Sequence, residues 1–208
     1  MKLNERFRGY LPVVVDLETG GFDASVNPLL ELACGFLSWQ NDIITLDHVT
    51  AWAIDPHPGS VINPASLQVT GINLDDPLRS AQDERTVLEQ FFKRVRQAMK
   101  EADCHRAIMV AHNASFDLGF LNAACVRTGI KRNPFHPFSS LDTASLAAVA
   151  VGHTVLQESC RRAGLNFDPT QAHSAAYDVE RTAHLFCYIV NRSNFTSHQT
   201  EIIPPEQI

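Results

Sequence analysis

The sequence lacks closely spaced cysteines, long hydrophobic runs and an excess of positive charge, and each absence narrows its possible functions. Its five cysteines are far apart and none forms a Cys-x-x-Cys pair, which argues against a zinc site. We expect them to be small core residues in a reducing compartment. The net charge of −6 argues against a strongly basic protein but leaves open a local basic patch.

The hydrophobic run near the N-terminus is far shorter than the roughly 20 residues that a membrane span needs. It occupies residues 11–15 and leads into carboxylates, so we expect neither a signal sequence nor a membrane span, and a cytoplasmic location. Residues 1–195 contain no linker or repeat and predict a single domain. The tail, residues 196–208, holds two prolines and little apolar periodicity, which predicts a mobile segment.

The alternation of apolar patterns predicts an α/β fold. Three strands joined by short loops come first, as is typical of an antiparallel meander, and helices then alternate with further strands. The expected strands are 11–17, 29–37, 46–54, 107–111 and 138–141, and the expected helices are 63–70, 81–101, 116–128, 143–151, 154–163 and 174–191. This order predicts a mixed sheet with helices on both faces and functional residues at strand ends and helix starts.

Two carboxylates, Asp16 and Glu18, lie one residue apart at the end of the first expected strand. Residues i and i+2 of a strand point to the same face, so these side chains should lie side by side. Two buried carboxylates repel each other, and a hard divalent cation such as Mg²⁺ or Mn²⁺ would compensate. Taken alone, the pair is more typical of a solvated strand end than of a metal site.

Three further polar residues, Asp117, His173 and Asp178, lie at or near the starts of expected helices, where functional residues of an α/β fold gather. Asp117 falls in the first turn of the helix after strand 107–111, and His173 precedes the start of the last helix, which contains Asp178. Taken singly, Asp117 fits an acid at a helix dipole, Asp178 a solvated helix face and His173 a loop histidine. Together they are harder to dismiss, because their order in the chain is an acid pair, a further acid, and then a histidine followed by an acid.

These residues belong to three segments that resemble the motifs of the DEDD exonuclease superfamily, in the subgroup with histidine in the third motif. The three segments are Asp16–Thr19, His112–Asp117 and His173–Asp178. Further segments resemble the branch of this superfamily that trims the 3′ ends of stable RNA, namely 6–9, 106–113, 131–138 and 170–174. The resemblance therefore extends over most of the chain.

The resemblance implies a ribonuclease H-like α/β fold, with a mixed five-stranded sheet flanked by helices. It implies a metal-dependent 3′-to-5′ exoribonuclease that trims single-stranded 3′ ends of tRNA, rRNA and other stable RNA precursors, releases nucleoside 5′-monophosphates, and also digests single-stranded DNA. Two Mg²⁺ ions, with Mn²⁺ as an alternative, would be held by Asp16, Glu18, Asp117 and Asp178. His173 would act as the general base.

Three phenylalanines close to the motifs are candidates for stacking on bases. The resemblance implies this role for Phe22, Phe116 and Phe138, while packing at the edge of the core is the alternative. The sequence departs from the family at Val69, where another stacking phenylalanine is expected, and at Ala65, where a base-reading glutamate is expected. We therefore expect a weaker preference for the 3′-terminal base.

Six basic residues are scattered along the sequence, and by themselves they fit a solvated surface. They are Arg6, Arg8, Lys100, Arg106, Lys131 and Arg132. The resemblance implies that they form a basic patch away from the active site. Such a patch could serve the active site of a second subunit only in an antiparallel homodimer, which the resemblance also implies.

Two alternative functions are considered. A proofreading exonuclease or an oligoribonuclease would carry the same acids, although segments 6–9 and 131–138 favour the RNA-trimming branch. A non-catalytic nucleic-acid-binding or scaffold protein on the same fold would be expected to have lost a metal ligand. The four acids and His173 are all present, which favours an enzyme.

Overall fold

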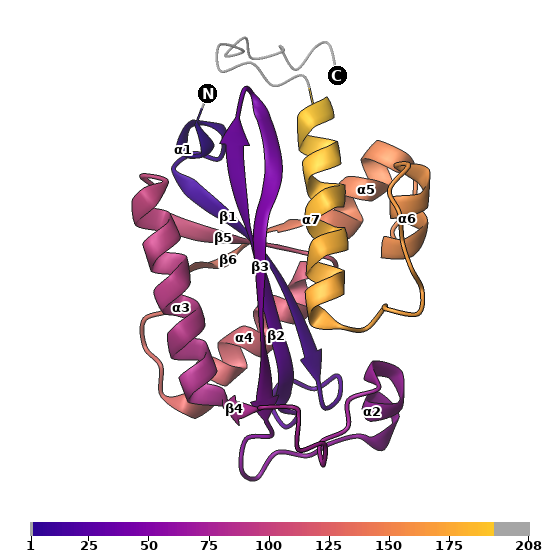
Figure 1. The fold of residues 1–208 in the computed structure, drawn as a ribbon. Helices are drawn as coiled ribbons and strands as arrows, with labels where there is room; N and C mark the ends of the chain where they lie inside the picture. Colours follow the sequence, from indigo (N-terminus) through magenta and orange to yellow (C-terminus); the bar gives the residue numbers. More distant parts are fainter. Residues whose placement is uncertain (1, 194–208) are drawn as a thin grey trace, which may run out of the picture.

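A twisted six-stranded sheet runs through the centre of the computed structural model, which describes residues 2–193 (Figure 1). The strands lie in the order β4-β3-β2-β1-β5-β6. Their bounds are β1 Tyr10–Thr19, β2 Leu29–Gln40, β3 Ile43–Asp55, β4 Gln82–Asp83, β5 Arg106–Ala111 and β6 Phe135–Asp142. The pairs β1·β2 and β2·β3 are antiparallel, whereas β5 is parallel to β1 and β6 is parallel to β5. The predicted meander and mixed sheet are confirmed.

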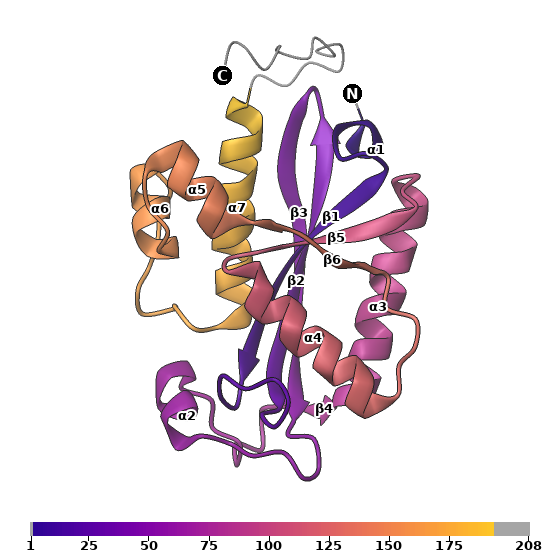
Figure 2. The same ribbon diagram turned by 180° about the vertical axis from the view of Figure 1, so that it is seen from behind.

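Helices cover both faces of this sheet. Their bounds are α1 Leu3–Arg6, α2 Pro64–Thr70, α3 Glu84–Glu101, α4 Ala114–Thr128, α5 Thr143–Val151, α6 Leu156–Arg162 and α7 Ala175–Arg192. Helices α3 and α4 lie against one face, and α7 lies against the other with α5 and α6 packed on its outer side (Figures 1 and 2). The α/β class with flanking helices is therefore confirmed.

Strand β1 lies in the middle of the sheet because its residues suit burial on both faces. Val13, Val14 and Val15 are fully buried, and β-branched side chains favour the extended backbone. Helix α3 presents Phe91 and Phe92 to the core from the same apolar stripe that predicted the helix. The first carboxylates of the candidate site thus stand at the end of a rigid central strand.

Helix α2 differs from the others because none of its residues is buried. Its ends are capped as the sequence predicts. The Asn63 side chain accepts a hydrogen bond from the Ala65 N–H at 3.0 Å, and Gly71 ends the helix in the left-handed conformation. The helix stands beside the end of β1 (Figure 1), so it borders the candidate site without contributing to the core.

Two short elements of the structure, β4 and α1, were not predicted from the sequence. The sheet has six strands where five were expected, because Gln82 and Asp83 pair with the end of β3 as β4 in a place predicted to be helix. Helix α3 consequently begins at Glu84, with Asp83 as its N-cap. The short helix α1 was not predicted, since four residues carry too little periodicity to reveal it.

Two further predictions concern the ends of the chain and membranes. The predicted tail, 196–208, lies outside the described residues, so the proposed division of the chain stays a prediction. Among residues 2–193, no helix has the length and apolar character needed to cross a bilayer.

Candidate active site

The first two acids of the candidate site lie on the last residues of β1. Asp16 is partly exposed and Glu18 is only 8% exposed. Glu18 stands opposite Glu31 of the antiparallel strand β2, and the register shifts immediately after it, between Glu18 and Thr19. Bulges of this kind re-aim side chains at strand ends. A third carboxylate, that of Glu31, is therefore brought to the pair by the sheet itself.

Asp117 reaches the same place from the first turn of α4. Asn113, between β5 and α4, takes the left-handed conformation with φ of 67°, which asparagine tolerates better than most residues. The chain thereby turns back so that Asp117, 3% exposed, accepts a hydrogen bond from the Leu17 N–H at 3.1 Å. That bond fixes Asp117 between the positions of Asp16 and Glu18.

His173 and Asp178 enter from the start of α7. The His173 N–H donates to Asp178 Oδ2 at 3.0 Å, and the His173 backbone has φ of 66°. Potential ligand atoms of Glu18, His173 and Asp178 all lie within 4.8 Å of one another. The Ala175 N–H donates to Glu31 Oε2 at 3.4 Å, which links the helix start to the sheet. Residues far apart in the sequence thus converge at the C-terminal end of the central strand β1.

The electrostatics of the cluster disfavour ionised carboxylates. Burial, together with the charges of Asp178, Glu31 and Asp117, raises the pKa of Glu18 to about 8. Burial and the surrounding acids also raise the pKa of Asp16 well above its ordinary value. Burial raises the pKa of Asp117 and of Asp178, although backbone N–H donors partly oppose this. Perturbed acids that converge in this way are typical of functional sites.

The cluster has the properties of a divalent cation site. Asp178 Oδ1 is buried and has no hydrogen-bond partner among the described residues. A buried polar atom without a partner is costly unless a ligand satisfies it. Carboxylate oxygens are the donors that hard divalent cations prefer, and a cation would relieve the repulsion that raises the pKa values. The donor set therefore fits metal binding.

An aromatic surface adjoins the acids. Phe22 is 86% exposed on the loop after β1, and its ring lies 6.3 Å from that of Phe116 in an edge-on arrangement. Phe116 in turn packs on Phe120 at 4.7 Å and immediately precedes Asp117. An exposed ring beside a half-buried ring offers a flat apolar face next to the carboxylates, which suits a nucleobase.

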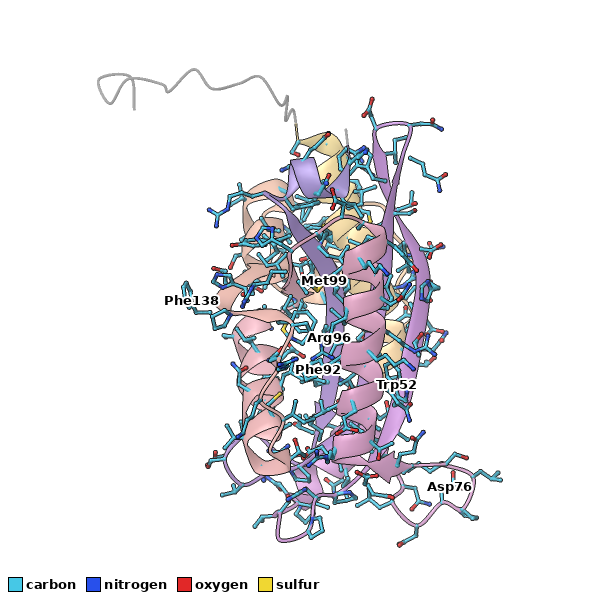
Figure 3. The ribbon with its side chains drawn as sticks, turned by 90° about the vertical axis from the view of Figure 1, so that its left-hand side faces the viewer. Trp52, Asp76, Phe92, Arg96, Met99 and Phe138 are labelled. Atoms are coloured by element: carbon cyan, nitrogen blue, oxygen red, sulfur yellow. The ribbon has the colours of Figure 1, made fainter. Side chains whose placement is uncertain are left out.

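The other residues predicted to contact the substrate are also exposed. Phe138 on β6 is 80% exposed, packs edge-on against His136 at 4.5 Å, and projects outward from the molecule (Figure 3). Val69 and Ala65 lie on the solvent-facing surface of α2. Their exposure agrees with positions available to a substrate, and no ring stands at either of them.

The basic residues gather away from the acids. Arg6 and Arg8 precede β1, Lys100 lies in the last turn of α3, and Arg106 begins β5, where it pairs with Tyr10. They therefore lie at the opposite end of the sheet from Glu18. Arg106 Nη1 also donates to the Phe135 carbonyl at 3.4 Å.

The remaining basic residues follow α4. Lys131 and Arg132 line a groove of about 390 Å³ with residues of α3, including Arg96. Arg96, labelled in Figure 3, donates to the Arg132 carbonyl. This pair therefore extends the positive charge along the α3 side of the molecule.

Two site residues were missed from the sequence. Glu31 is an acid inside an apolar strand, which was the available signal, but its meeting with Glu18 depends on strand register. Asp142 caps α5 and also accepts bonds from the N–H groups of Asn113 at 2.9 Å and Ala114 at 3.3 Å. It thus joins the end of β6 to the helix that carries Asp117.

Comparisons with known proteins agree with this geometry. A family model described as an exonuclease, RNase_T, matches residues 13–186. Ribonuclease T of Shewanella frigidimarina (strain NCIMB 400) is 54% identical over 192 residues, which are 92% of this chain and 87% of the relative. The residues matched by the family model include all the candidate acids and His173.

Two solved structures are similar in fold. A 3′-exonuclease described in the 3′-end-specific recognition of histone mRNA stem-loop has a TM-score of 0.69 and 15% identity over 86% of this chain and 63% of that chain. Exonuclease I of E. coli in complex with a dT13 oligonucleotide has a TM-score of 0.66 and 14% identity, over 86% of this chain and 41% of that chain. The family model and the sequence relative show that the chain belongs to the ribonuclease T family of exonucleases, which hydrolyse RNA from its 3′ end.

Proposed function

We propose that this 3′-to-5′ exoribonuclease trims single-stranded 3′ ends of tRNA, rRNA and other stable RNA precursors, and that it releases nucleoside 5′-monophosphates. The observation that carries the proposal is the convergence of four carboxylates and His173 beside an exposed aromatic surface. A single strand can enter such an open site, whereas a duplex cannot place its paired bases on Phe22. We further propose that single-stranded DNA is a substrate, because stacking on a ring does not distinguish the two sugars.

We propose that the acids hold two Mg²⁺ ions, with Mn²⁺ as an alternative. Asp16, Glu18, Asp117 and Asp178 would be the ligands, since all four are oxygen donors in one cluster. Bound metal would supply Lewis acidity at the scissile phosphate and at the departing 3′ oxygen. The unpartnered Asp178 Oδ1 supports this ligand role.

His173 is the proposed general base. Its ring is exposed at the mouth of the acid cluster, within reach of Glu18 and Asp178, and a ring nitrogen would accept the proton of the attacking water. The bond from the His173 N–H to Asp178 fixes the backbone of this residue. This backbone bond does not involve the imidazole ring, which is the group that would take up the proton.

The substrate is held, in this proposal, by stacking and by a distant basic surface. Phe22, Phe116 and Phe138 would stack on the last bases. Arg6, Arg8, Lys100, Arg106 and Lys131 would bind the RNA backbone for the active site of the second subunit in a symmetric homodimer. The position of Arg6, Arg8, Lys100 and Arg106 at the opposite end of the sheet from Glu18 supports this division of roles. The five unpaired cysteines support a cytoplasmic location.

The test is digestion of a 5′-labelled RNA hairpin with a single-stranded 3′ tail, in Mg²⁺, in Mn²⁺ and in chelator. The wild type should produce a ladder that shortens from the 3′ end and stops near the duplex. Asp178→Asn should abolish the ladder, whereas Asp75→Asn, an exposed acid near α2, should leave it unchanged. Digestion in chelator, or full activity of Asp178→Asn, would overturn the proposal.

A further inference from the structure

The loop that carries Phe22, residues 20–28, is held at its two ends by backbone hydrogen bonds. The Gly20 N–H donates to the Pro28 carbonyl at 2.9 Å, and the Asn63 N–H donates to the Gly20 carbonyl at 2.7 Å. These bonds secure the base of the loop. The position of its middle, where the exposed ring stands, depends on other contacts.

One such contact comes from the last turn of α4. Arg127 Nη1 donates to the Ala24 carbonyl at 3.2 Å. The first turn of the same helix presents Phe116 to the Phe22 ring. Helix α4 therefore touches the middle of the loop at two places, through a ring at its beginning and a guanidinium at its end.

The guanidinium of Arg127 is itself held in a fixed orientation. Glu84 is 2% exposed, and its carboxylate accepts from Arg127 Nε at 2.7 Å and from Nη2 at 2.5 Å. Glu84 is fixed in turn as the first residue of α3, directly after β4, and the helix dipole favours an anion there. Because two of its nitrogens bind one carboxylate, the planar guanidinium group cannot rotate freely, and Nη1 stays directed toward the Ala24 carbonyl.

We propose that Arg127 is a positioning residue for substrate binding, which acts through Phe22 and not on the reacting atoms. This rests on the proposed stacking role of Phe22. An exposed ring on a mobile loop would lose conformational freedom when a base stacks on it, and that loss would weaken binding. The bond to Ala24 adds to the bonds within the loop, such as that from the Asp23 N–H to Asn27 Oδ1 at 2.8 Å, and fixes the residues next to Phe22 before the substrate arrives. Asp117 is held by the Leu17 N–H and Asp178 by the His173 N–H, so the chemical step does not depend on the bond from Arg127.

Arg127→Lys tests the proposal without leaving Glu84 buried and unpaired. Lysine keeps a positive charge beside Glu84, but its single terminal nitrogen cannot serve both carboxylate oxygens and the Ala24 carbonyl. The matched control is Arg85→Lys, because Arg85 Nη1 donates to the Thr128 carbonyl at 3.2 Å at the same helix junction without reaching the loop.

With single-stranded RNA, Arg127→Lys should raise KM by about three- to tenfold, the effect of losing one hydrogen bond. Its kcat and the Mg²⁺ concentration for half-maximal activity should stay within about twofold of wild type, and Arg85→Lys should resemble wild type in all three values. A loss in kcat, an unchanged KM, or an equal effect in the control would overturn the proposal. If Arg127→Lys is unfolded, the double variant Glu84→Gln with Arg127→Gln, which removes both charges, takes its place.

The same measurements in a Phe22→Ala background show whether Arg127 acts through the ring. Phe22→Ala should raise KM, and adding Arg127→Lys should then change it by less than about 1.5-fold, since the two act as one unit. Full additivity would overturn the proposal. A wild-type KM for Phe22→Ala would refute the stacking role and this inference with it, whereas an impaired Phe22→Ala beside a normal Arg127→Lys would refute this inference alone.

Discussion

Replacing Glu18 by glutamine should stabilise the metal-free protein while it abolishes activity. Glu18 is almost fully buried, and burial together with the charges of Asp178, Glu31 and Asp117 raises its pKa from 4.5 to about 8. Folding therefore places a group that prefers to ionise in a site that opposes ionisation. Glutamine has nearly the same shape and no charge, so it removes this conflict and also removes a proposed metal ligand.

The magnitude follows from the two pKa values. The unfolded chain ionises Glu18 above pH 4.5, whereas the folded chain retains the proton until about pH 8. Each pH unit in this window costs the folded state about 1.4 kcal/mol, which amounts to about 3 kcal/mol at pH 7 as an upper figure. The folded pKa of Glu18 is the raised one. The wild-type protein with protonated Glu18 therefore has its full stability below pH 4.5, and this contribution to stability is lost as the pH rises through about 8.

The assay is urea unfolding in chelator at about pH 5 and about pH 7. The variant should exceed the wild type by about 2–3 kcal/mol near neutrality, and the difference should nearly vanish at the lower pH. The control is Glu89→Gln, an exposed acid paired with Arg85, which should change stability by less than about 1 kcal/mol. Saturating Mg²⁺ should stabilise the wild type more than the variant. Equal stabilities at both pH values would refute the electrostatic reasoning.

Three further predictions concern catalysis and binding. His173→Ala should still bind RNA and metal but lose most turnover, measured as kcat beside filter binding; wild-type turnover would refute its role as base. With Val69 and Ala65 in place of the expected ring and glutamate, turnover on oligonucleotides that differ only in the last base should vary little; a strong bias against one base would contradict this. Neutralising Arg6 and Arg8 should weaken RNA binding and flatten its dependence on salt; an unchanged salt slope would remove them from the binding surface.

Much of the fold could be predicted because its signals are local. The valine run of β1 predicts a buried strand, and Asn63 with Gly71 predicts both ends of α2. Strand β4 could not be predicted in this way. Its two residues are exposed and carry no apolar signal, and they become a strand only because β3 supplies a partner. Pairing of this kind depends on the folded sheet and not on the segment itself.

The candidate ligands could be predicted for a similar reason. Asp16 and Glu18 share a strand face, and Asp117 and Asp178 stand in first turns of helices, so their places in the sequence mark them as candidates, although their selection as ligands rests on the family resemblance. Glu31 could not be recognised as their neighbour. Its side chain faces Glu18 through antiparallel register, and the bulge beside Glu18 that shifts this register has no sequence signature.

The residues that hold the site in place escape prediction for a more general reason. Asp117 bonds to the N–H of Leu17, Arg127 to the carbonyl of Ala24, and Glu31 to the N–H of Ala175. In each case the partner is a backbone group, which nearly every residue possesses, so the identity of the partner residue carries no trace of the bond. Such contacts become visible only in three dimensions. These contacts also hold the acids and the Phe22 loop in position. A variant that tests one of them must therefore preserve charge and burial while it removes a single hydrogen bond.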